Sequence, residues 1–216
     1  MNILGLNAFH GDASAALLTD GQITAAVEEE RFNRIKHWAG FPGLAARWCL
    51  DGTDDADLAH VAISRDPKAH LALKLLRLAS RPGDWGRLAS RTQNTMKVAR
   101  LAASLANAGI ALPEAVQVHH VEHHHSHLAS AFFSSPLEEA AVISIDGFGD
   151  FSSVMWATGR GPHLEVQGAT HFPHSLGLFY TAFTQFLGFP KYGDEYKMMG
   201  MSAYGEPRFL NQMRDV

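Results

Sequence analysis

The sequence predicts an α/β fold with two lobes, because one arrangement of strands and turns occurs twice along its 216 residues. The first copy opens with an apolar strand at residues 2–7 and a turn at residues 10–12. The second opens with a buried strand at residues 140–145 and a glycine turn at residues 146–150. Each turn presents backbone N–H groups and a carboxylate at a strand end. This is the layout of a two-lobed actin-like (ribonuclease H-like) ATPase fold, in which two such turns face each other across a cleft.

The elements of the first lobe follow from its apolar runs and turn residues. Asp20-Gly21 is a strong hairpin signal between two apolar runs, and Pro42 suits the first turn of a helix. Arg81-Pro82-Gly83 is expected to break the helical region near its middle. The expected elements are strands at 2–7, 13–19, 22–27, 58–64 and 116–120, and helices at 43–50, within 67–107, and at 122–133.

The second lobe begins in the same way but ends early. After the strand at 140–145 we expect strands at 152–158 and 164–171 and a helix at 176–187. The pattern stops at Val216 before a sheet of the first lobe's size is complete. We therefore expect lobes at 1–138 and 139–216, the second incomplete, in a fragment or an unusually short relative of a longer enzyme.

Composition indicates an ordinary globular protein. Hydrophobic residues make up 46%, charged residues 19%, and the net charge is −4, which argues against disorder and against nucleic-acid binding. The single cysteine, Cys49, excludes an internal disulfide and a multi-cysteine zinc site. No apolar run approaches the ~20 residues that span a bilayer. The first basic residue is Arg31, so the start lacks the charged region of a secretory signal. We expect a cytoplasmic protein without membrane contact.

Basic residues gather in one segment. Residues 65–100 hold nine Lys and Arg but only two Asp. One interpretation is a pair of amphipathic helices whose arginines stay in water, and the other is a basic face for a partner or an anionic ligand. The nine are Arg65, Lys68, Lys74, Arg77, Arg81, Arg87, Arg91, Lys97 and Arg100.

Histidine is the compositional anomaly, with thirteen in all and six between residues 119 and 127. Histidines four apart project from one helix face, about 6 Å along the axis, which suits two imidazoles on one metal. Of the three histidine pairs with this spacing, only His123/His127 lies wholly inside a helix that begins near Glu122. The helix motif of zinc proteases is excluded, because it requires glutamate where His124 stands. The alternative is a surface turn that binds metal only adventitiously. The pairs with this spacing are His119/His123, His120/His124 and His123/His127.

A third ligand is needed, and Asp146 is the candidate because it ends a buried strand just after the helix. Mixed histidine and aspartate ligation favours iron(II), manganese or zinc. The alternative for Asp146 is a turn residue that bonds its own backbone. Gly147 and Gly149 allow a close backbone approach to an anion, as a phosphate-binding nest does.

Three further sites have two interpretations each. His10, beside Asp12 in the first turn, is suited to be a general base for a hydroxyl, or it is structural. Lys36 reaches a phosphate or carbamoyl oxygen, or it belongs to an ion-paired surface. Asp194 and Lys197 hold a ribose and a phosphate, or they cap a helix.

Taken together, these strings resemble the NodU/CmcH family of O-carbamoyltransferases. The resemblance covers almost the whole chain except the basic helices, through five motifs in order. The motifs are residues 7–17, residues 28–32 with Lys36 and His37, residues 122–127, Asp146-Gly147 with Gly149, and Asp194-Glu195 with Lys197.

The resemblance implies an amino-terminal domain similar to the actin-like domain that makes threonylcarbamoyl-adenosine in tRNA. It implies a metal bound by His123, His127 and Asp146. It also implies a carbamoyl-adenylate, made from carbamoyl phosphate and ATP in a separate carboxy-terminal domain, whose carbamoyl group passes to an acceptor hydroxyl here. In this family His10 corresponds to the histidine near that hydroxyl, and Lys36 to the lysine that contacts the donor.

Two positions depart from the family pattern. In many members histidine directly precedes aspartate, whereas Gly11 intervenes here, and Tyr196 stands where glycine is common. A fourth metal ligand and the adenylate-forming domain are missing, so this chain alone is not expected to complete the reaction. The expected function is metal- and ATP-dependent carbamoyl transfer to a hydroxyl of a sugar or natural product. The alternatives are an actin-like sugar kinase or hydrolase that uses Asp146 as a base, and a non-catalytic lobe that binds nucleotide or a partner.

Overall fold

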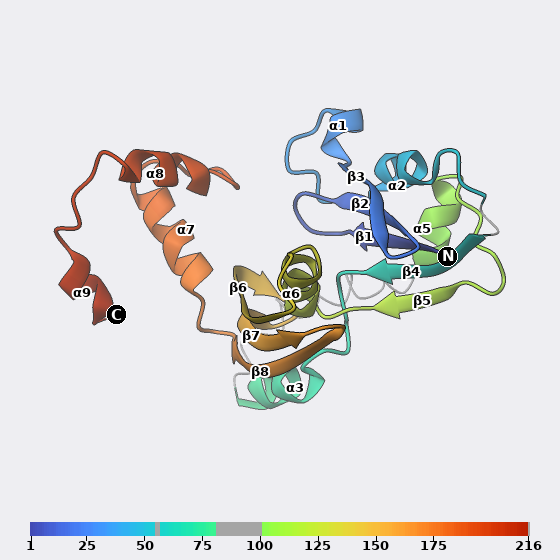
Figure 1. The fold of residues 1–216 in the computed structure, drawn as a ribbon. Helices are drawn as coiled ribbons and strands as arrows, with labels where there is room; N and C mark the ends of the chain where they lie inside the picture. The colour runs from blue at the N-terminus through green and yellow to red at the C-terminus, as the bar shows by residue number, and fades with distance from the viewer. Residues whose placement is uncertain (55–56, 81–100, 216) are drawn as a thin grey trace.

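The computed structural model describes residues 1–54, 57–80 and 101–215, and the strands within them form two sheets (Figure 1). The first sheet has the order β3-β2-β1-β4-β5. β1 (Asn2–Asn7), β2 (Ser14–Thr19) and β3 (Gln22–Glu28) pair antiparallel, whereas β4 (Leu58–Ile63) and β5 (Gln117–His120) continue the sheet parallel to β1. This order, with three antiparallel strands followed by two parallel ones, is that of an actin-like (ribonuclease H-like) lobe. The predicted fold class is confirmed.

The first sheet forms because its strands alternate between core and surface. Leu4 and Leu6 of β1 are buried with Leu17 of β2, at every second position as a pleated strand requires. Helices α2 (Gly43–Leu50) and α5 (Leu101–Asn107) add side chains to the same core. The Asp20-Gly21 hairpin has positive φ at both residues, as the predicted turn requires.

The second sheet consists of β6 (Glu139–Gly149), β7 (Ser152–Arg160) and β8 (His163–His171), all antiparallel. Helix α6 (His123–Phe133) packs on one face, where Leu128 and other apolar side chains form a second core. Although we assign α6 to the first lobe from sequence, it packs on the second sheet. The boundary at residue 138 stays a prediction.

The predicted glycine turn at residues 146–150 is wrong in its position. Strand β6 continues through Gly149, and the turn lies at Asp150-Phe151, where both φ angles are positive. The register between β6 and β7 shifts between Ile145 and Gly149, so the glycine-rich string is an irregular stretch of strand. A bulge of this kind turns side chains of one strand toward a site without ending the strand.

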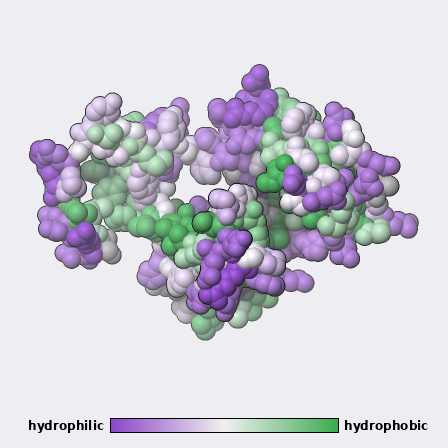
Figure 2. All heavy atoms as spheres, viewed as in Figure 1, coloured by the Kyte–Doolittle hydropathy of each residue, from purple (hydrophilic) through white to green (hydrophobic). Residues whose placement is uncertain are grey.

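The remaining helices lie around the two sheets. Figure 1 shows the last three helices on the opposite side of the second sheet from the first sheet, while the segment between α7 and α8 returns toward α1. Figure 2 shows hydrophobic surface between α7 and the second sheet. Ile145 of β6 and Leu178 of α7 are exposed. These helices are α1 (Glu30–Asn33), α3 (Leu71–Ser80), α7 (Leu176–Phe186), α8 (Glu195–Ser202) and α9 (Leu210–Arg214).

Part of the basic segment lies outside the described residues. The predicted break at Arg81-Pro82-Gly83 falls there, and so do five of the nine basic positions, so the basic face stays a prediction. The five basic positions are Arg81, Arg87, Arg91, Lys97 and Arg100.

In the described part of the chain, no helix combines the length and apolar character needed to cross a membrane.

Candidate metal centre

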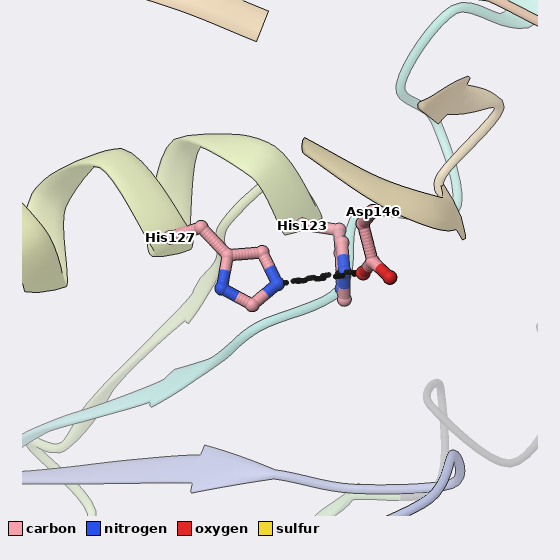
Figure 3. A group of neighbouring side chains, drawn as sticks. All are labelled: His123, His127 and Asp146. Carbon is pink, nitrogen blue, oxygen red and sulfur yellow. Dashed lines mark hydrogen bonds and ion pairs between the residues drawn. The ribbon is translucent and has the colours of Figure 1, made fainter. Parts of the chain in front are cut away.

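Three side chains from α6 and β6 point toward one position. Nε2 of His123 lies 2.8 Å from Oδ2 of Asp146 and 3.0 Å from Nε2 of His127. The third distance, between Nε2 of His127 and Oδ2 of Asp146, is 3.6 Å. Figure 3 shows both imidazoles turned toward the carboxylate. Within residues 1–54, 57–80 and 101–215, no other group of three such side chains brings its ligand atoms this close together.

The spacing of these atoms fits one cation. Ligand atoms about 2.1 Å from a metal ion are about 3.0 Å apart in octahedral and about 3.4 Å apart in tetrahedral geometry. The three measured distances lie around these values. Two imidazoles and one carboxylate are a donor set suited to iron(II), zinc or manganese. The residues therefore fit the predicted metal.

The residue at which α6 begins decides which histidines face Asp146. α6 begins at His123, so His119 lies in β5 instead, where its Nε2 is 3.1 Å from Nδ1 of His60. His124 is fully buried, and its Nδ1 lies 2.8 Å from Oγ of Ser144. Only the pair one turn apart within α6, His123 and His127, faces the carboxylate.

Two carboxylates fix the beginning of α6. The first N–H groups of a helix have no acceptor inside the helix. Glu122 caps the helix by accepting a hydrogen bond from the His125 N–H at 2.7 Å. Oδ2 of Asp150 accepts one from the His123 N–H at 3.1 Å. Sequence reasoning missed Asp150 in this role, because its partners are far away along the chain.

Asp146 acts both as part of the irregular strand and as a partner of the imidazoles. Its Oδ1 accepts from the Gly147 N–H at 2.6 Å, while Oδ2 faces the two histidines. Hydrogen bonds from His123 and then His127 hold the pKa of Asp146 well below its usual range, against the effect of burial. The carboxylate is therefore ionised, which is the form that binds a cation.

His10 lies directly beside this group. Its ring meets the ring of His123 edge-on, with centroids 5.2 Å apart. Its Nε2 is buried and has no hydrogen-bond partner among the residues that the structure describes. Burial, then the neighbouring His123 and Arg65, lower the pKa of His10 to about 4. The structure thus brings His10 to the triad as a neutral imidazole.

Asp12 has a different partner from the one its sequence position indicates. Its Oδ1 lies 2.8 Å from Nδ1 of His37, 25 residues away. The ring of Tyr192 stands edge-on to that of His37, with centroids 5.3 Å apart, and a side chain at Gly11 would overlap the Tyr192 ring. Tyr192 is a neighbour of the site that sequence reasoning missed, and His37, known from the sequence only as part of a family motif, is a second neighbour. The sequence signal for the close approach of Tyr192 was the glycine at position 11, which has no side chain.

The predicted donor- and nucleotide-binding residues are engaged in ion pairs. Nζ of Lys36 lies 2.7 Å from a carboxylate oxygen of Glu30, and Nζ of Lys197 lies 2.6 Å from one of Asp194. Side-chain hydrogen bonding lowers the pKa of Glu30 and of Asp194. The Lys36 pair is the ion pair that its alternative interpretation describes. Asp194 is the N-cap residue of α8 but makes no side-chain cap hydrogen bond, and the binding roles of these residues stay predictions.

The two glycines of the predicted phosphate nest differ in their surroundings. A Cβ at Gly149 would overlap the ring of His123, whereas a Cβ at Gly147 would meet only Cδ2 of Leu178 at 3.8 Å. Gly177 of α7 lies against the backbone of Asp146, where a Cβ would be 2.5 Å from the carbonyl oxygen. Phosphate binding by Gly147 and Gly149 stays a prediction, since both glycines already adjoin the metal-ligand candidates.

Comparison with known proteins identifies the family. A family model described as "Carbamoyltransferase N-terminus" matches residues 2–77 and 83–216. The chain belongs to this family. The predicted resemblance is confirmed.

Among the relatives of this chain is an uncharacterized protein of Synechocystis sp. The two are 38% identical over a region that covers 99% of this chain and 36% of the relative. Nodulation protein NolNO of Sinorhizobium fredii is 36% identical over 93% of the chain and 29% of that protein. The chain thus spans about a third of the length of these curated relatives. Among solved structures, YeaZ from Pseudomonas aeruginosa matches with a TM-score of 0.38 and 18% identity, covering 77% of this chain and 64% of that one.

Proposed function

We propose that the full-length protein transfers a carbamoyl group to a hydroxyl of a sugar or related natural product, and that this chain supplies the metal-binding part of its active site. The observation that carries the proposal is the convergence of His123, His127 and Asp146, in a chain of the carbamoyltransferase family. Carbamoyl phosphate and ATP are the proposed co-substrates. The remaining part of the protein forms the carbamoyl-adenylate.

His123, His127 and Asp146 are the residues that would hold a divalent cation. When bound, such a cation would supply Lewis-acid chemistry, polarising the carbamoyl carbonyl or neutralising the departing phosphate. Asp146 keeps both imidazoles turned toward one position, at 2.8 Å and 3.6 Å from its Oδ2.

His10 is the proposed proton acceptor for the attacking hydroxyl. Its Nε2 is buried beside His123 without a competing protein partner in the described structure. A hydroxyl placed between His10 and the triad therefore meets a neutral imidazole within the same small region. Asp12 acts from the other side of Gly11, where it holds His37 in place at 2.8 Å.

Lys36 and Lys197 are each paired with a carboxylate. A lysine ammonium has three N–H donors, so each can contact the donor or the nucleotide beside that carboxylate. The Gly147 N–H is donated to Asp146 and becomes available to a phosphate only if that bond opens. These roles belong to the proposal.

The test uses the full-length protein with carbamoyl phosphate, ATP, a divalent metal and a panel of hydroxylated acceptors. We expect a product that is heavier by one carbamoyl group and that depends on ATP. His127→Ala abolishes it, whereas His163→Ala, a change on the exposed start of β8, does not. Absence of a carbamoylated product from every acceptor counts against the proposal.

The kinase or hydrolase alternative requires Asp146 to act as a base without a metal. In the structure Asp146 is already engaged by two imidazoles and one backbone N–H. Metal analysis of the purified full-length protein separates the two functions, because that alternative predicts no metal that is lost on replacement of His123 or His127.

A further inference from the structure

The metal-ligand candidate His123 is the first residue of α6, and the first turn is a weakly held part of a helix. Helix ends fray, because their terminal N–H groups lack partners inside the helix. A ligand at such a position holds its geometry only if something outside the helix fixes it. Oδ2 of Asp150 does so, accepting a hydrogen bond from the His123 N–H at 3.1 Å.

The same oxygen also binds a second, distant segment. Oδ2 of Asp150 accepts from the Asp66 N–H at 2.8 Å, across 84 residues. The neighbouring Arg65 donates through Nη1 to the carbonyl oxygen of Phe9 at 3.2 Å. Since Phe9 precedes His10, the turn that carries Asp150 is linked to both sides of the site, the start of α6 and the turn of His10.

An independent observation concerns the residue before Asp150. The ring of His123 occupies the space where a side chain of Gly149 would stand. Gly149 does not have a positive φ, so backbone conformation does not explain the need for glycine there. The reason is the close approach of the imidazole.

We infer that Gly149 and Asp150 are positioning residues for the metal centre: Gly149 admits the His123 ring, and Asp150 fixes the His123 backbone and joins it to the Asp66 segment. This inference rests on the proposed function, because it requires that His123 binds a metal. In this inference Gly149 and Asp150, the last two residues of the Asp-Gly-Phe-Gly-Asp string, position a metal ligand instead of binding phosphate. Preorganised ligands bind more tightly because less motion is lost on binding.

The experiment measures Co²⁺ affinity of the full-length protein from the visible absorption of the bound ion. Asp150→Ala removes the acceptor of two N–H groups, and we expect binding weaker by about 10- to 100-fold, the usual effect of losing an outer-shell partner. Asp150→Asn keeps an oxygen that accepts hydrogen bonds, so its affinity is expected to stay close to that of the wild type. A merely structural effect of charge loss would move both variants together.

A second pair of variants tests the inference without removing a hydrogen-bonding group. Gly149→Ala displaces the His123 ring and is expected to abolish or strongly weaken Co²⁺ binding. Gly200→Ala in α8, where nothing lies within 4 Å of the added Cβ, is the matched control for metal affinity. Thermal unfolding of the metal-free variants checks that each is folded.

The outcomes separate the two proposals. Wild-type Co²⁺ affinity in both Asp150→Ala and Gly149→Ala overturns the positioning role and leaves the proposed function standing. Equal losses in Asp150→Ala and Asp150→Asn overturn the hydrogen-bond argument. If the wild type itself binds no Co²⁺ that depends on His123, then the metal centre fails and the positioning role fails with it.

Discussion

Leu128 links the stability of the protein to its metal centre, because it lies in α6 next to His127. Its side chain is fully buried against the second sheet, in a cluster with Phe132, Val142 and Met155. Replacement by alanine removes buried apolar volume and leaves a cavity. The observed range for fully buried leucines predicts a loss of about 3 kcal/mol in the free energy of unfolding. For a chain of this size, that corresponds to a fall in Tm of roughly 6–12 °C.

The assay is chemical denaturation of Leu128→Ala beside Leu137→Ala, the same substitution at an exposed site just beyond α6. We expect the control to stay within about 0.5 kcal/mol of the wild type. Because α6 carries both proposed histidine ligands, Co²⁺ affinity of Leu128→Ala should fall as well. Equal stabilities for the two variants would refute the packing of α6 on the second sheet.

Three further predictions concern single groups. Burial raises the pKa of Cys49, so its thiol should react slowly with a thiol reagent at pH 8 and quickly after unfolding. Ser144→Ala leaves Nδ1 of buried His124 without its partner and should cost about 1–3 kcal/mol in denaturation experiments, and an unchanged midpoint would contradict this. The hydrogen bond from Lys36 lowers the pKa of Glu30, so its stabilising effect is present above the ordinary glutamate pKa and is lost as the pH falls through the lowered value. In Lys36→Met, an NMR titration should show the Glu30 pKa returning toward its ordinary value.

The sequence alone predicts the elements well where local signals are strong. The Asp20-Gly21 hairpin and the alternation of β1 and β2 are encoded within a few neighbouring residues. The helix start after Glu122 selects His123 and His127 in the same way, because a spacing of four has meaning only inside a helix. The buried apolar run at 140–145 predicts that Asp146 follows directly on a strand, and the structure extends that strand through Gly149.

The glycine-rich string shows where this reasoning ends. Glycine and aspartate together favour a turn, yet β6 continues through Gly149, because β7 pairs with it on both sides of the irregular stretch. Pairing with a neighbouring strand is a long-range interaction, and it overrides the local preference. The turn itself falls at Asp150-Phe151, which carries no glycine.

Residue types and helical spacing in the sequence determined which side chains are able to bind a metal. Tertiary structure alone decided their surroundings: Asp12 meets His37, Tyr192 occupies the space beside Gly11, and Asp150 joins His123 to Asp66. The physical reason is that helix periodicity and turn preference act over a few residues, whereas these contacts join segments 25 to 181 residues apart and exist only once the chain has folded.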